Sequence, residues 1–294
     1  MVGEHLLPSA PPPQLFAKGY AQIQLTYITH FYCNQKNIDS VISLLRLYES
    51  YSPELLDLIM FVVVDDGSPL HYEIPHFNLN LRWIKIKEDI PWNQAGARNL
   101  GVTYAVSDKI VLSDLDFYLF ENTLWHLVRH KPCGRNVYKI YRENEKGECI
   151  RGHVNMFFMS RARFMRFFGY DEEFAGHYGR EDDSFKKLHK WSGSKLKYLP
   201  KKFRSKEWIE STNTMDSSSY HNLIRTRESP NYSLHERKKQ EVYDYGAEYG
   251  YSRLFLHNFT WEFLSEQRRV SYPKPKPNRW WFYLWYWRWL VGYA

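Results

Sequence analysis

Short apolar runs alternate with helix-like periodicity over most of the chain, and this alternation predicts the fold class. Six runs have the length and pattern of β-strands, at 23–29, 58–64, 81–86, 109–112, 137–141 and 154–159. Five segments have helical spacing or helix-boundary residues, at 37–51, 91–106, 123–130, 160–168 and 182–190, and Ser160 is the expected N-cap of the fourth. Strands that alternate with helices predict an α/β domain with a mostly parallel, doubly wound central sheet. Such a sheet binds its ligands beyond the carboxyl ends of the strands.

The pattern weakens on both sides of this region. Residues 1–20 are rich in proline and predict a flexible leader, whereas residues 201–245 are polar with little periodicity and predict a long loop or lid. Residues 273–277 alternate Pro and Lys, which is typical of a stiff linker, and an aromatic stretch follows at 279–290. We therefore divide the chain into a leader (1–20), an α/β domain (21–200), a loop, lid and helical completion of that domain (201–272), and a linker with an aromatic tail (273–294).

Composition narrows the class of protein. Hydrophobic residues make up 44% of the 294 residues and aromatic residues 18%, which is enough for a large core. The net charge of +7 favours an anionic ligand or an anionic membrane surface. It also suits nucleic acid, but the basic residues are dispersed and no nucleic-acid-binding motif is present, so we expect no nucleic-acid partner. The three cysteines lack a Cys-x-x-Cys spacing, which argues against a zinc site or disulfide framework and favours a reducing compartment.

Membrane contact is expected only at the periphery. The chain has no pattern of a signal peptide and no apolar run long enough to span a bilayer. The aromatic tail at 279–290 carries Trp and Tyr between two arginines, as interfacial helices do. We expect a cytoplasmic protein that contacts the cytoplasmic face of a membrane through this tail; packing of the tail on the domain is the alternative.

Three acidic clusters carry the candidate chemistry. Asp65 and Asp66 follow the apolar strand 58–64, Asp114-x-Asp116 follows the strand 109–112, and Glu181, Asp182 and Asp183 open the helix 182–190. An Asp-x-Asp at a strand end can hold a hard divalent cation and, through it, a diphosphate. A later carboxylate nearby could take a proton from an attacking hydroxyl. The alternatives are turn-capping carboxylates and acids that favour a helix N-terminus.

The order of these motifs resembles the GT-A glycosyltransferases, most of all family 2. The resemblance rests on residues 62–68 (VVVDDGS), 93–101 (NQAGARNLG), Asp114-x-Asp116 and 169–183 (GYDEEFAGHYGREDD), and it covers about residues 22–190. It implies a GT-A fold, Rossmann-like, with a C-terminal helical and aromatic extension. It also implies transfer of a hexose-type sugar with inversion from a nucleotide-diphosphate donor, expected to be a UDP-sugar, with Mn²⁺ or Mg²⁺. The acceptor would be a hydroxyl of a glycan or a lipid-linked saccharide.

The resemblance assigns roles to individual residues on the donor side. Asp65, with Asp66 beside it, would contact the nucleobase or ribose, and Arg98 would lie near the nucleotide. Asp116 would ligate the cation, and Asp114 would contact the ribose, the metal or its water. The remaining expected contacts to the donor are Thr29, Phe31, Asn93 and His153.

On the acceptor side, Asp182 would be the catalytic base and Glu181 a supporting or acceptor-binding acid, with Asp183 as a second candidate base. His221 is the expected third metal ligand and His235 the alternative. Arg180 stands where many relatives have a second glycine before the acidic pair, and this departure puts the approach of the acceptor in doubt.

Two other classes of protein share some of these features. A sugar-nucleotide nucleotidyltransferase also uses a Rossmann-like sheet and a metal, but residues 27–37 contain no glycine and so no glycine-rich phosphate loop. A non-catalytic carbohydrate-binding protein could retain the fold, but the intact acidic clusters argue against it.

Overall fold

The computed structural model describes residues 20–34, 37–152, 155–208, 229–246, 249 and 257–269. The predicted leader, His153, His221 and the aromatic tail at 279–290 lie outside the described residues. Among the described residues, no helix is long and apolar enough to cross a membrane.

An eight-stranded sheet forms the centre of the molecule, in the order β10-β6-β9-β4-β1-β2-β3-β12. Its strands β3, β2, β1 and β4 are parallel, β9 is antiparallel to both β4 and β6, and β12 is antiparallel to β3. The bounds are β1 (Leu25–Phe31), β2 (Ile59–Asp65), β3 (Asn80–Ile86), β4 (Lys109–Asp114), β6 (Asn136–Lys139), β9 (Phe157–Ser160), β10 (Lys195–Tyr198) and β12 (Trp261–Gln267). The predicted α/β class and mostly parallel sheet are confirmed.

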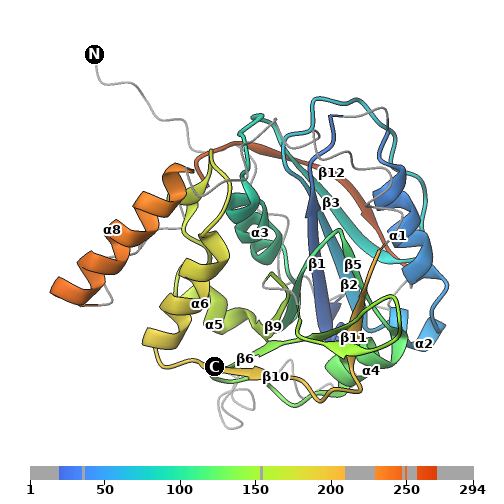
Figure 1. Cartoon of the computed structure of the whole chain (residues 1–294). Coiled ribbons are helices and arrows are strands. Elements are labelled where there is room, and N and C mark those ends of the chain that lie inside the picture. The colour runs from blue at the N-terminus through green and yellow to red at the C-terminus, as the bar shows by residue number, and fades with distance from the viewer. Residues whose placement is uncertain are drawn as a thin grey trace, which may run out of the picture.

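Helices cover both faces of this sheet (Figure 1). One face carries α1 (Asp39–Glu49), α2 (Pro53–Leu56) and α4 (Glu121–Arg129), and the other carries α3 (Gln94–Thr103), α5 (Arg161–Arg166) and α6 (Glu181–Trp191). Alternate residues of β2 enter the two cores: Phe61 and Val63 enter one, Met60 and Val62 the other. Burial on both faces explains why this strand is apolar throughout. As predicted, Ser160 caps α5, because its side chain accepts a hydrogen bond from the Arg163 amide.

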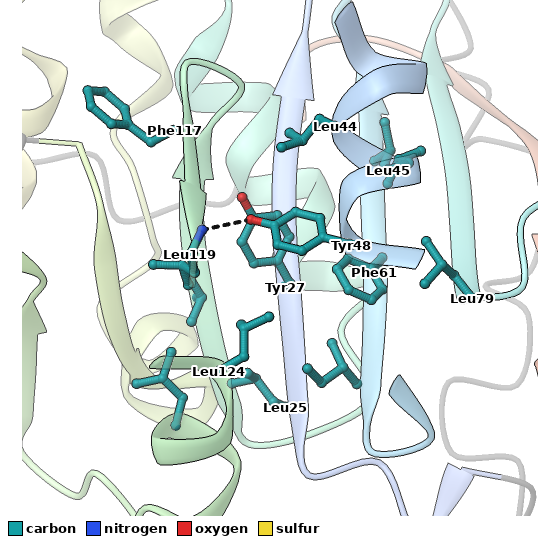
Figure 2. Packing of buried hydrophobic residues seen from close by; sticks show 14 of the residues in the cluster. Leu25, Tyr27, Leu44, Leu45, Tyr48, Phe61, Leu79, Phe117, Leu119 and Leu124 are labelled. Atoms are coloured by element: carbon teal, nitrogen blue, oxygen red, sulfur yellow. Dashed lines mark hydrogen bonds between the residues drawn. The ribbon is translucent and has the colours of Figure 1, made fainter. Parts of the chain in front are cut away.

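Aromatic side chains fill the core beneath α1 (Figure 2). The Tyr27 ring lies 5.1 Å from the Tyr48 ring and 5.6 Å from the Phe61 ring, measured between centroids. The Tyr48 hydroxyl accepts a hydrogen bond from the Leu119 amide at 3.1 Å, so its polar end is paired inside the core. Truncating one such ring to alanine typically costs about 3–5 kcal/mol of stability. Most of the abundant aromatic residues that the structure describes thus serve packing.

A second, four-stranded sheet lies beside the first, in the order β5-β11-β7-β8. Its strands are β5 (Phe117–Leu119), β7 (Tyr141–Glu143), β8 (Cys149–Ile150) and β11 (Arg204–Glu207). Strand β5 begins directly after the Asp114-x-Asp116 motif, and it pairs antiparallel with β11. The small sheet therefore joins residues after 200 to the acidic end of β4.

The predicted loop over 201–245 is wrong for two segments, β11 and α8 (Pro230–Tyr245). Helix α8 docks through polar contacts. Lys238 Nζ lies 2.7 Å from Asp171 Oδ2, with both side chains buried, and Asn231 Nδ2 donates to the carbonyls of Phe174 and His177. A helix that docks through charged and amide side chains lacks the apolar stripe that marks most surface helices, so its periodicity gave no signal.

Candidate functional site

Two of the acidic clusters meet at the guanidinium of Arg98. Its Nη1 donates to Oδ1 of Asp182 at 2.8 Å, and its Nη2 donates to Oδ1 of Asp114. Asp114 ends β4 and Asp182 lies in the first turn of α6, so one side chain joins segments 68 residues apart. The site therefore lies at the carboxyl edge of the parallel strands, where the sequence predicted it.

Helix α3 holds Arg98 beneath the site. The helix presses against β1: a Cβ added at Gly101 would lie 2.4 Å from a methyl carbon of Ile28. Arg98 is 1% exposed, and a buried guanidinium is tolerated only when its charge is paired. Burial lowers its pKa, but Tyr170, Asp114 and Asp182 together outweigh burial and raise the pKa above its ordinary value. Arg98 thus contacts two carboxylates and Tyr170, and its place near the nucleotide stays a prediction.

Tyr170 and Asn155 complete this network, and sequence reasoning missed both. The Tyr170 hydroxyl accepts from Arg98 Nη1 at 2.5 Å and donates to Asp182 Oδ1 at 2.9 Å. Asn155 Nδ2 donates to Asp114 Oδ2 at 2.7 Å, so both oxygens of Asp114 already accept hydrogen bonds from the protein. Tyr170 follows Gly169 directly and lies within the motif 169–183. Its place in this motif was the one signal in the sequence that could have identified it.

The three acids at the start of α6 lie in different environments. Asp182 and Glu181 are buried, and burial is the main cause that raises the pKa of each carboxyl; the Arg98 cation opposes this at Asp182. Glu181 Oε1 accepts from Trp92 Nε1 at 3.0 Å, while its Oε2 is buried and has no hydrogen-bond partner among the described residues. Asp183 is 42% exposed and pairs instead with Lys186 and Arg180. The structure thus brings Asp182 and Glu181 into the site and turns Asp183 away from Arg98.

Arg180 precedes these acids in a left-handed backbone conformation, with φ 76°. This conformation is unfavourable for a residue with a side chain, which explains why glycine is usual there. Its guanidinium lies 4.1 Å from the ring centroid of Tyr232 in α8 and 3.0 Å from Asp183. These contacts, one with α8 and one with α6, offset the strain and direct the Arg180 side chain away from Asp182.

Asp65 and Asp66, at the end of β2, also lie in different environments. Asp65 is fully buried and accepts from the Ser68 amide at 2.8 Å and from the Tyr72 hydroxyl at 2.5 Å, with Lys85 Nζ 3.6 Å away. Asp66 Oδ1 is buried without a hydrogen-bond partner among the described residues. Burial, and next the neighbouring Asp65, hold the pKa of Asp66 well above its ordinary value. The Asp65 carboxylate thus already has partners within the protein. Asp66 lies beside Asn93, which lowers its pKa, and its Oδ1 has no hydrogen bond among the described residues.

The other residues that were expected to contact the donor differ in their burial and hydrogen bonding. Thr29 and Asn93 are buried, and each has a polar side-chain atom, Oγ1 and Nδ2, without a partner among the described residues. Phe31 is a core residue whose ring packs against Tyr72 and Trp83. His30, which the sequence did not suggest, stands opposite Asp114 in the β1–β4 register, and burial followed by Arg98 lowers its pKa to about 4.

The residues at the end of β4 fit a hard divalent cation that takes few ligands from the protein and the rest from water and phosphate oxygens. Asp116 is half-buried, and its carbonyl accepts from the Trp208 amide at 2.7 Å, which fixes the turn. Within the described part of the chain, no three His, Cys, Asp or Glu residues gather as a metal site. Mg²⁺ and similar ions commonly take one or two carboxylates, with water and phosphate oxygens completing the shell. His235 does not fit this role, because Ser184 and Lys187 each lie 2.7 Å from one of its ring nitrogens.

Solved structures of glycosyltransferases are similar to this chain. TarS from S. aureus in complex with UDP-GlcNAc is 13% identical, covers 75% of this chain and 67% of its own, and has a TM-score of 0.53. The mannosyltransferase PcManGT from Pyrobaculum calidifontis is 16% identical, with coverage of 78% and 66% and a TM-score of 0.48. Drosophila β1,4-galactosyltransferase 7 is 14% identical, with coverage of 60% and 64% and a TM-score of 0.40.

The chain thus spans about two thirds of the length of these structures. No family model and no curated protein matches it. The likeness to TarS shows the fold: the chain has the GT-A fold, as the resemblance of its motifs implied.

Proposed function

We propose that the protein is a metal-dependent glycosyltransferase that moves a hexose-type sugar from a nucleotide-diphosphate donor to a hydroxyl group. The observation that carries this proposal is the junction of Asp114 and Asp182 on Arg98. It sets the end of β4, which suits a cation and diphosphate, beside a buried carboxylate that suits a general base. The GT-A fold agrees with this chemistry but does not by itself imply it.

Asp182 is the proposed base. Its Oδ1 accepts hydrogen bonds from Arg98 and Tyr170, which leaves Oδ2 for the proton of the acceptor hydroxyl. As that proton moves to Oδ2, the acceptor oxygen bonds to the anomeric carbon, and the bond from that carbon to the diphosphate oxygen breaks. Attack opposite the diphosphate inverts the anomeric centre. The raised pKa makes Asp182 a stronger base than an exposed aspartate.

Asp116 is the proposed protein ligand of Mn²⁺ or Mg²⁺. A bound cation of this kind neutralises charge on a departing diphosphate. Asp114 lies close by in sequence, but Arg98 and Asn155 hold both of its oxygens, so we assign it mainly to positioning. His153 and His221 keep their proposed roles toward the diphosphate and the cation.

The proposed donor is a UDP-sugar. Asp66 Oδ1, which has no hydrogen-bond partner among the described residues, suits the N3–H of uracil, and the Asn93 side chain, which lies beside Asp66 and lowers its pKa, suits a neighbouring carbonyl of the same ring. UDP-GlcNAc bound to TarS supports this choice of nucleotide. The proposed acceptor is a glycan or a lipid-linked saccharide, with contact to a membrane through residues 279–290.

The test is a screen of UDP-, GDP- and CDP-sugars with and without Mn²⁺, in which we measure both thermal stabilisation and release of the nucleotide diphosphate. Asp182→Asn should lower turnover by about 10²–10⁴-fold and leave stabilisation by the donor intact. Asp183→Asn is the matched control, because Asp183 faces Arg180 and Lys186. Full turnover in the Asp182→Asn variant would exclude Asp182 as the base, and the absence of stabilisation by any nucleotide sugar would refute the proposed function.

A further inference from the structure

A basic and partly apolar surface lies at the opposite edge of the sheet from the candidate site. Strand β9 is antiparallel to both β4 and β6, and β10 is parallel to β6. The amino ends of β4, β6 and β10 therefore share one edge of the sheet. The turn before β6, helix α5, and the end of α6 with β10 meet there, and Figure 1 shows α5, the lower end of α6 and β10 together at the lower left. We call residues 131–135, 163–168 and 190–198 the basal surface.

The three segments of the basal surface are in contact. Arg163 Nη2 donates to the Ser192 carbonyl and its Nε to Ser194 Oγ, both at 2.8 Å, which ties α5 to the turn before β10. The Lys195 amide donates to the Arg135 carbonyl at 2.9 Å, which ties β10 to the turn before β6. The basal surface is thus one continuous region.

Its segments carry a strong positive charge, and the exposed Asp108, directly before β4, is an acid at the same edge. The three segments contain seven basic residues and no Asp or Glu: Lys131, Arg135, Arg163, Arg166, Lys190, Lys195 and Lys197. None of the seven forms an ion pair with any residue that the structure describes. Burial, followed by the charges of Arg166 and Arg135, lowers the pKa of Arg163, as expected where cations crowd one another.

Large apolar side chains are exposed on the same segments. In β10 they alternate with the lysines, so Leu196 and Tyr198 lie on the opposite face of this strand from Lys195 and Lys197. Leu196 is 39% exposed, Trp191 40% and Phe168 42%, and Tyr198 is also exposed. Half of the large hydrophobic side chains that are exposed in the described part of the chain therefore lie on this one surface. Exposed apolar groups that gather in one place mark an interaction site.

We propose that the basal surface docks the protein on an anionic lipid bilayer. Lysine and arginine near such a surface are attracted to the lipid headgroups, while tryptophan, phenylalanine and leucine enter the boundary of the acyl chains. Nucleic acid or an acidic polysaccharide would meet the charges but would gain little from Leu196. A second copy of the chain would present the same positive charges. The chain's own residues 270–294 carry four basic and no acidic residues, so their charge also opposes binding there.

The test is co-sedimentation of the full chain with phosphatidylcholine vesicles that contain or lack phosphatidylserine. We expect binding to the anionic vesicles, with strong weakening by added salt, and little binding to the neutral ones. Lys195→Glu with Lys197→Glu should weaken binding by at least about thirty-fold, since each lysine contributes a factor of about five. Leu196→Ser should weaken it by a smaller factor that salt does not change. Arg237→Glu with Lys239→Glu, an equal change of charge on α8, should have a much smaller effect.

Several results would overturn the proposal. One is unchanged vesicle binding in both the Lys195/Lys197 and Leu196 variants, which would leave the proposed contact of residues 279–290 to account for the binding. Another is an equal loss in the α8 control, which would indicate a general effect of net charge. A third is binding of duplex DNA, insensitive to Leu196→Ser, with no binding to anionic vesicles. Release of nucleotide diphosphate from a donor in solution should be unchanged in the basal variants, so this test does not depend on the proposed function.

Discussion

Arg98 donates from Nη1 to Oδ1 of Asp182 at 2.8 Å, and the guanidinium is almost completely removed from solvent. This contact joins α3 to α6 at the point where the acid of α6 must be fixed. The other terminal nitrogen of the guanidinium, Nη2, donates to Asp114, so Arg98 contacts both the donor side and the acceptor side of the proposed site. Disturbing Arg98 should therefore affect stability and chemistry together.

Arg98→Met should destabilise the protein by about 3–5 kcal/mol, because it leaves Asp114 and Asp182 buried without their cation. Urea unfolding followed by tryptophan fluorescence measures this change. Arg46→Met is the matched control: Arg46 pairs with Glu49 on an exposed helix surface, and its loss should cost about 1 kcal/mol or less. Similar losses in the two variants would contradict the assigned role of Arg98.

Asp66→Asn should change the preference among nucleotides, whereas Asp65→Asn should mainly lower stability. Asp66 has an open acceptor oxygen, and an amide there could donate to N3 of cytosine instead of accepting from N3–H of uracil. Isothermal titration with UDP and CDP measures the change, expected to be about 10–100-fold in the UDP/CDP ratio, since leaving a buried polar group without its hydrogen-bond partner costs about 1–3 kcal/mol. An unchanged ratio in Asp66→Asn would remove Asp66 from the nucleotide contacts.

Tyr170→Phe should lower turnover more than it lowers donor affinity. The variant removes the hydroxyl that donates to Asp182 Oδ1 and keeps the ring, which stacks on Phe185 with centroids 4.2 Å apart. A lost hydrogen bond to a carboxylate costs about 1.5–3 kcal/mol, so kcat should fall by about 10–100-fold while donor affinity holds. Steady-state kinetics give both values. Tyr104→Phe, which removes a hydroxyl bonded to Trp261, should leave kcat unchanged.

The stability of the wild type relative to Asp66→Asn should fall as the pH rises. Burial raises the pKa of Asp66 in the folded state above its unfolded value, so the folded protein holds this proton more tightly. The contribution is complete below the unfolded pKa and is lost as the pH passes through the folded pKa, at about 1.4 kcal/mol per unit of difference. Urea unfolding of both proteins from about pH 4 to about pH 8 tests the sign. A difference that grows with pH would show a lowered pKa instead.

Lys238→Met should destabilise the protein by about 3–5 kcal/mol, because it removes the cation of a buried ion pair and leaves the Asp171 carboxylate buried beneath α8 without its lysine. Hydrogen exchange should show faster exchange of α8 amides and of the turn before α6 than elsewhere. Lys239→Met removes a neighbouring lysine that is half exposed and, within the described part of the chain, pairs with Glu236 alone, and it should have little effect. If both variants exchange alike, α8 does not depend on the Lys238 contact.

The sequence by itself determined the α/β class, the parallel central strands and the edge at which the acids gather. Strands buried on both faces must be apolar throughout, as Ile59–Asp65 is until its last residue, and their carboxyl ends necessarily collect the polar residues that follow. Local patterns also identified the cap at Ser160. These features depend on neighbouring residues in the chain, and so the chain alone encodes them.

Only the tertiary structure decided which carboxylates are paired and which are open. Asp65 and Asp66 are adjacent and identical in sequence terms, yet Tyr72 and Ser68 occupy one while an oxygen of the other has no partner among the described residues. Arg98, Tyr170 and Asp182 meet across 84 residues of chain, and α8 docks through a buried lysine rather than an apolar stripe. Electrostatic pairing in a low-dielectric interior depends on distances between remote segments, which no local pattern of residues records.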